Sequence, residues 1–308
     1  MIDKPYFSVM IPTYNCAQYL RKTLHSVLQQ DLGIDLMQVE VIDDCSSDNV
    51  AEVVQEFGRD RVGFYRQKAN VGHVRNFETA WKRAKGKVVH LLHGDDFVLP
   101  GFYTSMMEMY ERYPDIGASY CRHFFVDELN DILGISQKEA IQDTVFYEYH
   151  KSLLQGQRIQ TPSITVKREV FEKMGGFNDK LAWTEDWEMW VRICKHYPIG
   201  YIKNPFAAYR IHQVSSTGAK ALTGENVRDL FRLKQIFLDS IVEPAERPAF
   251  ERSFRRVIFK VAESNYLQCK KLDNPNAKTH LRMMGRHAET KVKGLFYFIK
   301  YLLLSLGY

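Results

Sequence analysis

The sequence predicts an α/β protein with a mostly parallel, Rossmann-like sheet flanked by helices and a helical C-terminal region. Short apolar segments rich in β-formers alternate with segments of helical periodicity over residues 6–125, which is the pattern of a parallel sheet with helices on both faces. Polar and acidic residues directly follow three of the expected strands. After Ala221 the pattern is helical throughout, with breaks near Pro244 and Pro275.

Each element of this alternation is assigned from the spacing of its apolar residues. Helices carry them on one face, as Leu20, Leu24 and Val27 do. Between residues 126 and 145 the periodicity is lost, and we expect a mobile excursion there. The expected strands are residues 6–11, 39–42, 62–65, 87–92, 117–125, 161–166, 200–202 and 206–211. The expected helices are residues 17–30, 49–57, 71–84, 184–196 and one that Pro100 opens.

Composition and charge are those of an ordinary globular protein with a mild excess of positive charge. The 308 residues are 45% hydrophobic and 26% charged, which allows a full core. The formal net charge of +5 suits acidic ligands or an anionic membrane surface and is too small to indicate binding to nucleic acid. Five scattered cysteines without metal-site spacing indicate a reducing compartment. With no signal peptide and no run able to span a bilayer, we expect a cytoplasmic protein.

Polar residues stand at the ends of three expected strands. Thr13 to Asn15 follow the first strand, Asp43-Asp44 the second and Asp95-Asp96 the fourth. In open α/β sheets ligands bind beyond the carboxyl ends of the strands. We therefore expect these residues to meet in one crevice.

The pair Asp95-Asp96 indicates a cation. Adjacent carboxylates at a strand end repel each other unless a positive charge lies nearby. Hard oxygen ligands suit Mg²⁺ or Mn²⁺. A polar turn before Pro100 is the plainer interpretation.

The segment Thr184-Glu185-Asp186 opens an expected helix. Thr184 suits an N-cap, and acidic residues in a first turn complement the helix dipole, which explains both carboxylates structurally. Capping does not explain the neighbouring tryptophans, which we expect to form a partly apolar wall beside these carboxylates, suited to tuning a base. These tryptophans are Trp183, Trp187 and Trp190.

Short motifs occur in the order found in a known enzyme family. They are Pro12-Thr13-Tyr14-Asn15, Asp43-Asp44-Cys45-Ser46-Ser47-Asp48, Asn70-Val71-Gly72, Arg75-Asn76, Gly94-Asp95-Asp96, Gly175-Gly176-Phe177, Thr184-Glu185-Asp186 and Tyr209-Arg210-Ile211-His212. Over residues 7–212 the chain resembles family 2 glycosyltransferases. The resemblance implies a GT-A domain at 1–218, with a donor-binding half at about 1–125 and an acceptor-side half at about 126–218, followed by a helical region at 219–308.

The resemblance also implies an activity and a site. The activity is inverting transfer of a sugar from a nucleotide diphosphate donor, a UDP-sugar being favoured, to a hydroxyl of a glycan or lipid-linked acceptor in cell-surface polysaccharide or glycolipid synthesis. Asp186 is the implied general base, and Asp96 and His212 are implied ligands of Mn²⁺ or Mg²⁺. The implied nucleotide-sugar-binding residues are Pro12, Thr13, Tyr14, Asn15, Asp44, Asn70, Gly72, Arg75, Asp95 and Glu185.

Structural interpretations stay open for several of these residues. Asp43, Asp44 and Asp48 would suit caps of a helix that starts near Asn49. Arg75 would suit a solvated helix face.

Other ligand sets and functions also stay open. His93 stands where many relatives carry another Asp, and a lone histidine such as His212 is often an ordinary core or surface residue. A sugar nucleotidyltransferase would want a glycine-rich basic loop after the first strand, which residues 12–16 do not supply. A non-catalytic GT-A-like binding subunit would be favoured by loss of Asp96 or Asp186, and both are present.

The segment 291–308 is apolar or aromatic at almost every position, and its only charges are Lys291, Lys293 and Lys300. A helix apolar nearly all round must be buried in something. The alternatives are the chain itself, a homodimer or a membrane surface. Basic residues upstream would attract anionic headgroups, and we expect peripheral association with the inner face of the plasma membrane. These residues are Arg252, Arg255, Arg256, Lys260, Lys270 and Lys271.

Overall fold

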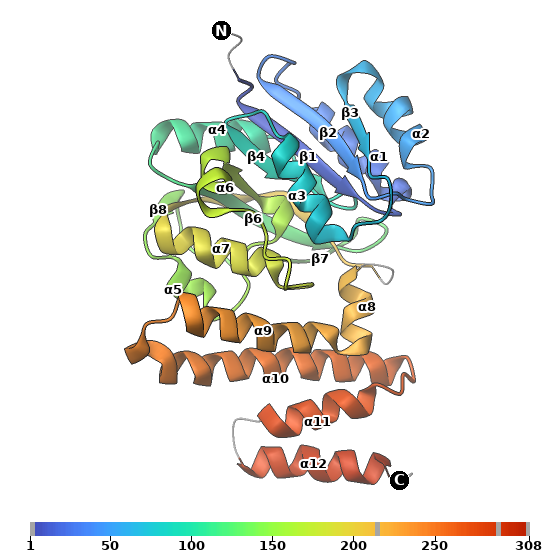
Figure 1. Ribbon diagram of the computed structural model, residues 1–308, viewed down its shortest axis with the longest axis vertical. Helices are drawn as coiled ribbons and strands as arrows, with labels where there is room; N and C mark the ends of the chain where they lie inside the picture. Colours follow the sequence, from blue (N-terminus) through green and yellow to red (C-terminus); the bar gives the residue numbers. More distant parts are fainter. Residues whose placement is uncertain (1–3, 213–215, 288–290, 306–308) are drawn as a thin grey trace. The chain divides into compact units, whose positions relative to one another are not determined.

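The computed structural model describes residues 4–212, 216–287 and 291–305 (Figure 1). The chain forms two compact units. The first comprises Met1–His150, Arg158–Asp179 and Met189–Ile211, and the second comprises Lys151–Gln157, Lys180–Glu188 and His212–Tyr308. The domain division expected at residue 218 stays a prediction.

The first unit is built on one ten-stranded sheet. The strand order is β3-β2-β1-β4-β9-β6-β10-β5, with β7 paired to β6 and β8 to β10. The pairs among β3, β2, β1 and β4 are parallel, as the sequence predicts, and the sheet becomes mixed where β9 runs antiparallel to both β4 and β6. The strands are β1 Phe7–Thr13, β2 Met37–Asp43, β3 Gly63–Arg66, β4 Val88–Leu91, β5 Phe97–Val98, β6 Ala118–Val126, β7 Ile132–Ile135, β8 Thr144–Phe146, β9 Ile164–Lys167 and β10 Ile199–Arg210.

Helices cover this sheet through their apolar faces. Leu20, Leu24 and Val27 of α1 are fully buried, and burial of each such side chain contributes about 1.5–3 kcal/mol. All seven residues of β1 are buried, so both faces of this strand are covered, as is usual for parallel sheets. The helices are α1 Ala17–Leu28, α2 Val50–Val53 with a following π turn Val54–Gly58, α3 His73–Arg83, α4 Phe102–Arg112, α6 Arg168–Met174 and the part of α7 Glu185–His196 from Met189 onward.

Most strand boundaries differ from those expected by one to three residues, and Thr161–Ser163, expected to begin a strand, is a 3₁₀ turn before β9. Two further differences involve a proline. β1 continues through Pro12 to Thr13. The Pro12 carbonyl accepts the Gly94 N–H on the side of β4. Proline lacks an N–H on that same side, but β4 has already ended at Leu91, so no strand hydrogen bond is lost. The segments expected as two strands at 200–202 and 206–211 form the single strand β10. Its register against β6 shifts on both sides of Pro205, and this irregularity breaks the apolar alternation in the sequence.

The expectation of a mobile excursion at residues 126–145 is wrong. The segment contains β7 and the start of β8, which pair antiparallel with β6 and β10. The apolar residues of β7 are largely exposed, with Ile132 at 65% and Leu133 at 59%. The strand therefore lacks the buried alternation by which a sequence reveals a strand.

The second unit is helical, as the C-terminal pattern predicts. Breaks fall at Pro244, in a 3₁₀ turn, and at Pro275, between two helices. Its core contains stacked aromatic rings, among them Trp187 on Phe254 at 5.6 Å between centroids. No helix in the described ranges is both long enough and apolar enough to cross a bilayer. The helices are α8 Ser216–Thr223, α9 Glu225–Ser240, α10 Arg247–Lys271, α11 Ala277–His287 and α12 Lys291–Ser305.

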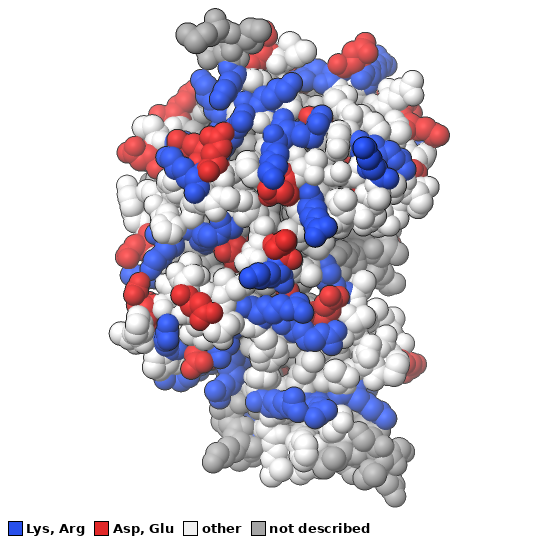
Figure 2. Space-filling model, in the orientation of Figure 1, with Lys and Arg blue, Asp and Glu red and all other residues white. Residues whose placement is uncertain are grey.

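The last helices of this unit are strongly basic. Residues 247–305 contain thirteen Lys and Arg against four Asp and Glu. Figure 2 shows Lys and Arg with few acidic residues over the part of this face where Figure 1 draws α10 and α11. A surface with this excess of positive charge attracts anionic partners.

Candidate active site

The carboxyl ends of β1, β2 and β4 are joined by backbone hydrogen bonds. The Asp44 N–H donates to the Thr13 carbonyl at 2.9 Å, and the Gly94 N–H donates to the Pro12 carbonyl at 3.1 Å. A Cβ atom at Gly94 would lie 2.8 Å from both Cys16 Sγ and Thr13 Oγ1, so only glycine fits there. The three polar strand ends predicted to converge therefore lie together in the first unit.

The loop after β1 is tied to the loop after β2. Asn15 has a positive φ of 49°, a conformation that asparagine tolerates better than most residues. Its side-chain oxygen accepts the Ser47 N–H at 2.8 Å, and its own N–H donates to Ser46 Oγ at 2.9 Å. Tyr14 between these anchors is 52% exposed. The loop thus holds an aromatic ring open to a ligand.

Two of the acidic residues after β2 have structural roles other than the predicted cap. Asp43 accepts the Ser46 N–H at 3.1 Å and pairs with Arg66 at 3.2 Å. Asp48 accepts the N–H of Ala17, the first residue of α1, at 2.8 Å. No side chain caps α2, so the alternative in which Asp43, Asp44 and Asp48 cap the helix near Asn49 is wrong.

Asp44 holds the turn that leads into α3. Its two oxygens accept the N–H groups of Val71 at 2.8 Å and Gly72 at 3.0 Å, and Asn70 also accepts from Gly72 at 3.1 Å. Burial raises the pKa of Asp44, although these two N–H groups favour its charged form. Arg75 is exposed in the first turn of α3, where the positive end of the helix dipole favours anions. The predicted residues Asn70, Gly72 and Arg75 thus gather beside Asp44.

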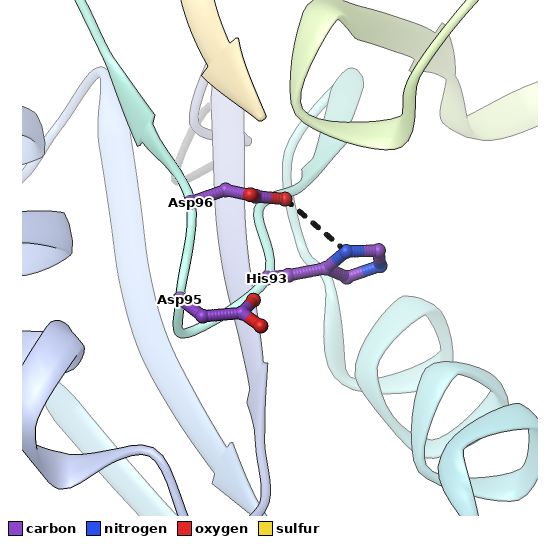
Figure 3. Close-up of side chains that lie close together, drawn as sticks. All are labelled: His93, Asp95 and Asp96. Carbon is purple, nitrogen blue, oxygen red and sulfur yellow. Dashed lines mark ion pairs between the residues drawn. The ribbon is translucent and has the colours of Figure 1, made fainter. Parts of the chain in front are cut away.

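His93, Asp95 and Asp96 form a cluster that could hold a metal ion (Figure 3). Each offers one ligand atom, and these atoms lie within 4.8 Å of one another. Asp96 is 1% exposed; its Oδ1 accepts the Arg210 N–H at 2.8 Å, and its Oδ2 lies 3.3 Å from His93 Nδ1. No hydrogen bond from the described residues is directed at this Oδ2. Burial raises the pKa of Asp96 to about 6, against the effect of His93, and a bound cation would favour the charged form.

Arg210 clamps the loop that carries this cluster. Its Nε donates to the Asp95 carbonyl at 2.8 Å, and its terminal nitrogens donate to the Asp127 carbonyl at 2.7 Å and the Asn130 side chain at 2.8 Å. Its guanidinium lies 4.6 Å from the centroid of the Tyr19 ring. The sequence places Arg210 within a motif but does not reveal this role, because its partners lie at least 80 residues away.

In the second unit, Asp186 lies in the first turn of α7. Its Oδ2 accepts Gln157 Nε2 at 3.0 Å, and its Oδ1 accepts the Trp187 N–H at 2.6 Å. Asp186 is half-buried and Glu185 is buried. The hydrogen bond from the Trp187 N–H agrees with the capping interpretation. Capping does not require the hydrogen bond from Gln157, which fixes the orientation of the carboxylate.

The expected tryptophan wall is wrong for two of its three members. Trp187 is 3% exposed and stacks on Phe254. Trp190 is 1% exposed and packs edge-on against Phe177 at 6.0 Å. Both are core residues, because an indole ring at these positions of α7 faces inward. Only Trp183 is half-buried.

His212 lies two residues after the end of β10 and is buried at 8% exposure. It belongs to the second unit, whereas Asp96 belongs to the first. Its role as a metal ligand stays a prediction.

A Rossmann-like half-sheet that carries an acidic, metal-competent cluster at its carboxyl edge defines the GT-A class of glycosyltransferases. The family model Glycosyl transferase family 2 matches residues 8–175, more than half of the chain. The chain therefore belongs to glycosyl transferase family 2.

Relatives and solved structures agree with this assignment. The glycosyltransferase MJ1057 of Methanocaldococcus jannaschii is 27% identical over 214 residues, which are 68% of this chain and 72% of the relative. S. aureus TarS 1-349 in complex with UDP-GlcNAc has a TM-score of 0.70 at 14% identity, over 96% of this chain and 90% of that chain. Mannosyltransferase PcManGT from Pyrobaculum calidifontis, in complex with GDP-Man and Mn²⁺, has a TM-score of 0.60 at 17% identity, over 99% and 88%. The chain spans half the length of a longer TarS structure.

Proposed function

We propose that this glycosyltransferase moves a sugar, with inversion, from a UDP-sugar to an acceptor hydroxyl, and that it depends on a divalent cation. The observation that carries the proposal is the His93, Asp95 and Asp96 cluster at the same sheet edge as Asp44. The solved neighbours that hold UDP-GlcNAc, or GDP-Man with Mn²⁺, support a nucleotide-sugar donor.

The donor nucleotide binds along the loops of β1 and β2. Asp44 uses one lone pair of each oxygen on the Val71 and Gly72 N–H groups, which leaves lone pairs for the imide hydrogen of a uracil. Exposed Tyr14 offers a ring face to the base. Arg75 and the positive end of α3 attract the phosphates. The other proposed donor-site residues are Pro12, Thr13, Asn15, Asn70 and Asp95 in the first unit and Glu185 in the second.

The donor atoms of the cluster favour Mn²⁺ over Mg²⁺. One imidazole nitrogen and two carboxylates form a mixed set, and Mg²⁺ prefers oxygen ligands alone whereas Mn²⁺ accepts imidazole more readily. When bound, the cation offsets the charge of the diphosphate leaving group. His212 stays a proposed additional ligand.

Asp186 is the proposed general base. Gln157 holds one oxygen at 3.0 Å, and the other lone pairs can accept the proton of the acceptor hydroxyl. The freed oxygen attacks the anomeric carbon, and the bond from that carbon to the diphosphate breaks on the opposite face. One displacement of this kind inverts the anomeric configuration.

The second unit is the proposed contact with a membrane and a lipid-linked acceptor. Tyr297 and Lys300 of α12 pack inward, on the rings of Phe259 at 5.5 Å and Tyr266 at 5.3 Å. Four apolar side chains of the same helix are 47–60% exposed, namely Leu295, Phe296, Phe298 and Ile299. An exposed aromatic face beside an excess of basic residues suits an anionic bilayer surface.

The proposal is tested by measuring release of UDP from a panel of UDP-sugars with Mn²⁺ and with EDTA. We expect release with Mn²⁺ and its loss in EDTA. A folded protein that binds UDP but releases none from any donor, with or without acceptor extracts, would favour the alternative of a non-catalytic binding subunit. Formation of a sugar nucleotide from a sugar phosphate would favour a nucleotidyltransferase.

A further inference from the structure

Asp229 of α9 holds the loop that precedes α7. Its side chain is fully buried. Its Oδ2 accepts the Trp183 N–H at 2.9 Å and the Thr184 N–H at 2.9 Å, and also the Thr184 hydroxyl at 2.8 Å. The Ala182 N–H lies 3.2 Å from both of its oxygens. One carboxylate therefore gathers three consecutive backbone N–H groups and a hydroxyl.

Lys220 binds a backbone carbonyl of the same loop. Lys220 of α8 donates from Nζ to the carbonyl of Ala182. Burial lowers the pKa of Lys220, and the negative charges of Glu185, Glu225 and Asp229 oppose this shift. Both the N–H and the carbonyl of Ala182 are thus bound by side chains of the C-terminal helices.

The loop geometry depends on this carboxylate. Buried N–H groups without an acceptor cost about 1–3 kcal/mol each, and successive N–H groups that point to one side form a natural anion site. Arg232, at 3.3 Å from Asp229 and half exposed, offsets the buried charge only in part. Without Asp229, the three N–H groups would have to turn toward other acceptors, and the loop would move.

This loop runs directly into Glu185 and Asp186. We propose that Asp229 is a positioning residue for catalysis, which fixes the orientation in which Asp186 is presented to the acceptor. The inference rests on the proposed role of Asp186 as the base. It assigns to the C-terminal helices, which lie outside the matched family region of residues 8–175, a direct part in setting the geometry of the reaction.

Asp229→Asn is the discriminating variant, because its amide keeps the shape but presents N–H groups to the loop's N–H groups. We expect kcat to fall by roughly 10–100-fold, since a displacement of about 1 Å can cost that much. The donor KM should change less than about threefold. Hydrogen exchange at the amides of residues 182–184 should accelerate. Asp239→Asn is the matched control, because Asp239 is exposed on the same helix and bonds only Gln235 among the described residues.

Thr184→Val keeps the inference testable if Asp229→Asn does not fold, since it removes one hydroxyl donor and retains the shape. A smaller loss in kcat with unchanged donor KM is expected. The inference is overturned if folded Asp229→Asn has the kcat of the wild type, with kcat calculated from the concentration of protein that binds donor. If Asp229→Asn does not fold, the same result in Thr184→Val overturns it. Failure of the proposed function is seen separately, as unchanged turnover in Asp186→Asn. In that case, faster hydrogen exchange at residues 182–184 in Asp229→Asn would still show that Asp229 holds the loop.

Discussion

The imidazole Nδ1 of His93 lies 3.3 Å from the buried Oδ2 of Asp96. The resemblance to the family implies an aspartate at the position of His93, so in this chain an imidazole nitrogen stands where a carboxylate oxygen is expected. The contact places this nitrogen beside a buried oxygen of Asp96 that accepts no hydrogen bond from the described residues. We therefore expect His93 to influence which metal ion the cluster prefers.

Replacing His93 should change the metal preference. In His93→Asp the cluster would offer three carboxylates, which suit Mg²⁺ better than the mixed set does. We expect the ratio of activity with Mg²⁺ to activity with Mn²⁺ to rise about tenfold, as measured by UDP release at saturating metal. His25→Asp, at an exposed position of α1, serves as the control. An unchanged ratio would remove His93 from the metal site.

Asp96→Asn should separate ligand binding from folding. The amide oxygen can still accept the Arg210 N–H, and the variant removes a carboxylate whose burial raises its pKa to about 6. We therefore expect the melting temperature of the metal-free protein to stay within a few degrees of wild type. Calorimetry should show that Mn²⁺ no longer strengthens UDP binding. If Mn²⁺ strengthens it as in wild type, Asp96 is not a ligand.

His90 should make the fold sensitive to acid. Its Nε2 lies 3.0 Å from the Pro162 carbonyl and its Nδ1 lies 3.1 Å from Tyr103 Oη, an arrangement that suits a neutral ring donating to the carbonyl. Burial lowers the pKa of His90 to about 3, below an unfolded value of about 6.5. The unfolded chain therefore binds the proton first, and the stabilisation is present above pH ~6.5 and lost as the pH falls.

The size of this effect is measurable by urea unfolding. Between pH 7.5 and 5.0 the contribution of His90 to the free energy of unfolding should fall by about 2 kcal/mol. His90→Gln should be less stable at pH 7.5 and should lose about 2 kcal/mol less over the same interval. Equal pH dependence of the two proteins would show that His90 titrates normally.

The exposed face of α12 should bind anionic membranes. Phe296→Ser with Phe298→Ser, or removal of the residues after Gly294, should release the protein from anionic liposomes in co-sedimentation and leave UDP binding intact. Ile141→Ser, at a 79% exposed position of the first unit, is the control. If the variants instead unfold or split an oligomer in ultracentrifugation, the face is core or a dimer interface.

The sequence predicts the parallel half of the sheet and the convergence of its polar ends because both follow from local apolar spacing. It does not reveal partners that are distant in the chain. Asp48 lies next to α2 in sequence but bonds the start of α1, and Asp229 reaches a loop 45 to 47 residues away. Trp187 and Trp190 are core residues rather than a ligand wall, and composition alone does not distinguish the two.

The most direct test of the account is the turnover of Asp186→Asn. With Mn²⁺ and a UDP-sugar that the wild type uses, kcat should fall by about 10²–10⁴, the usual loss when a general base is removed. The dissociation constant for UDP should stay unchanged, because the substitution keeps the shape of the side chain. A folded variant whose kcat stays within about threefold of wild type would contradict the assignment of Asp186 as the base.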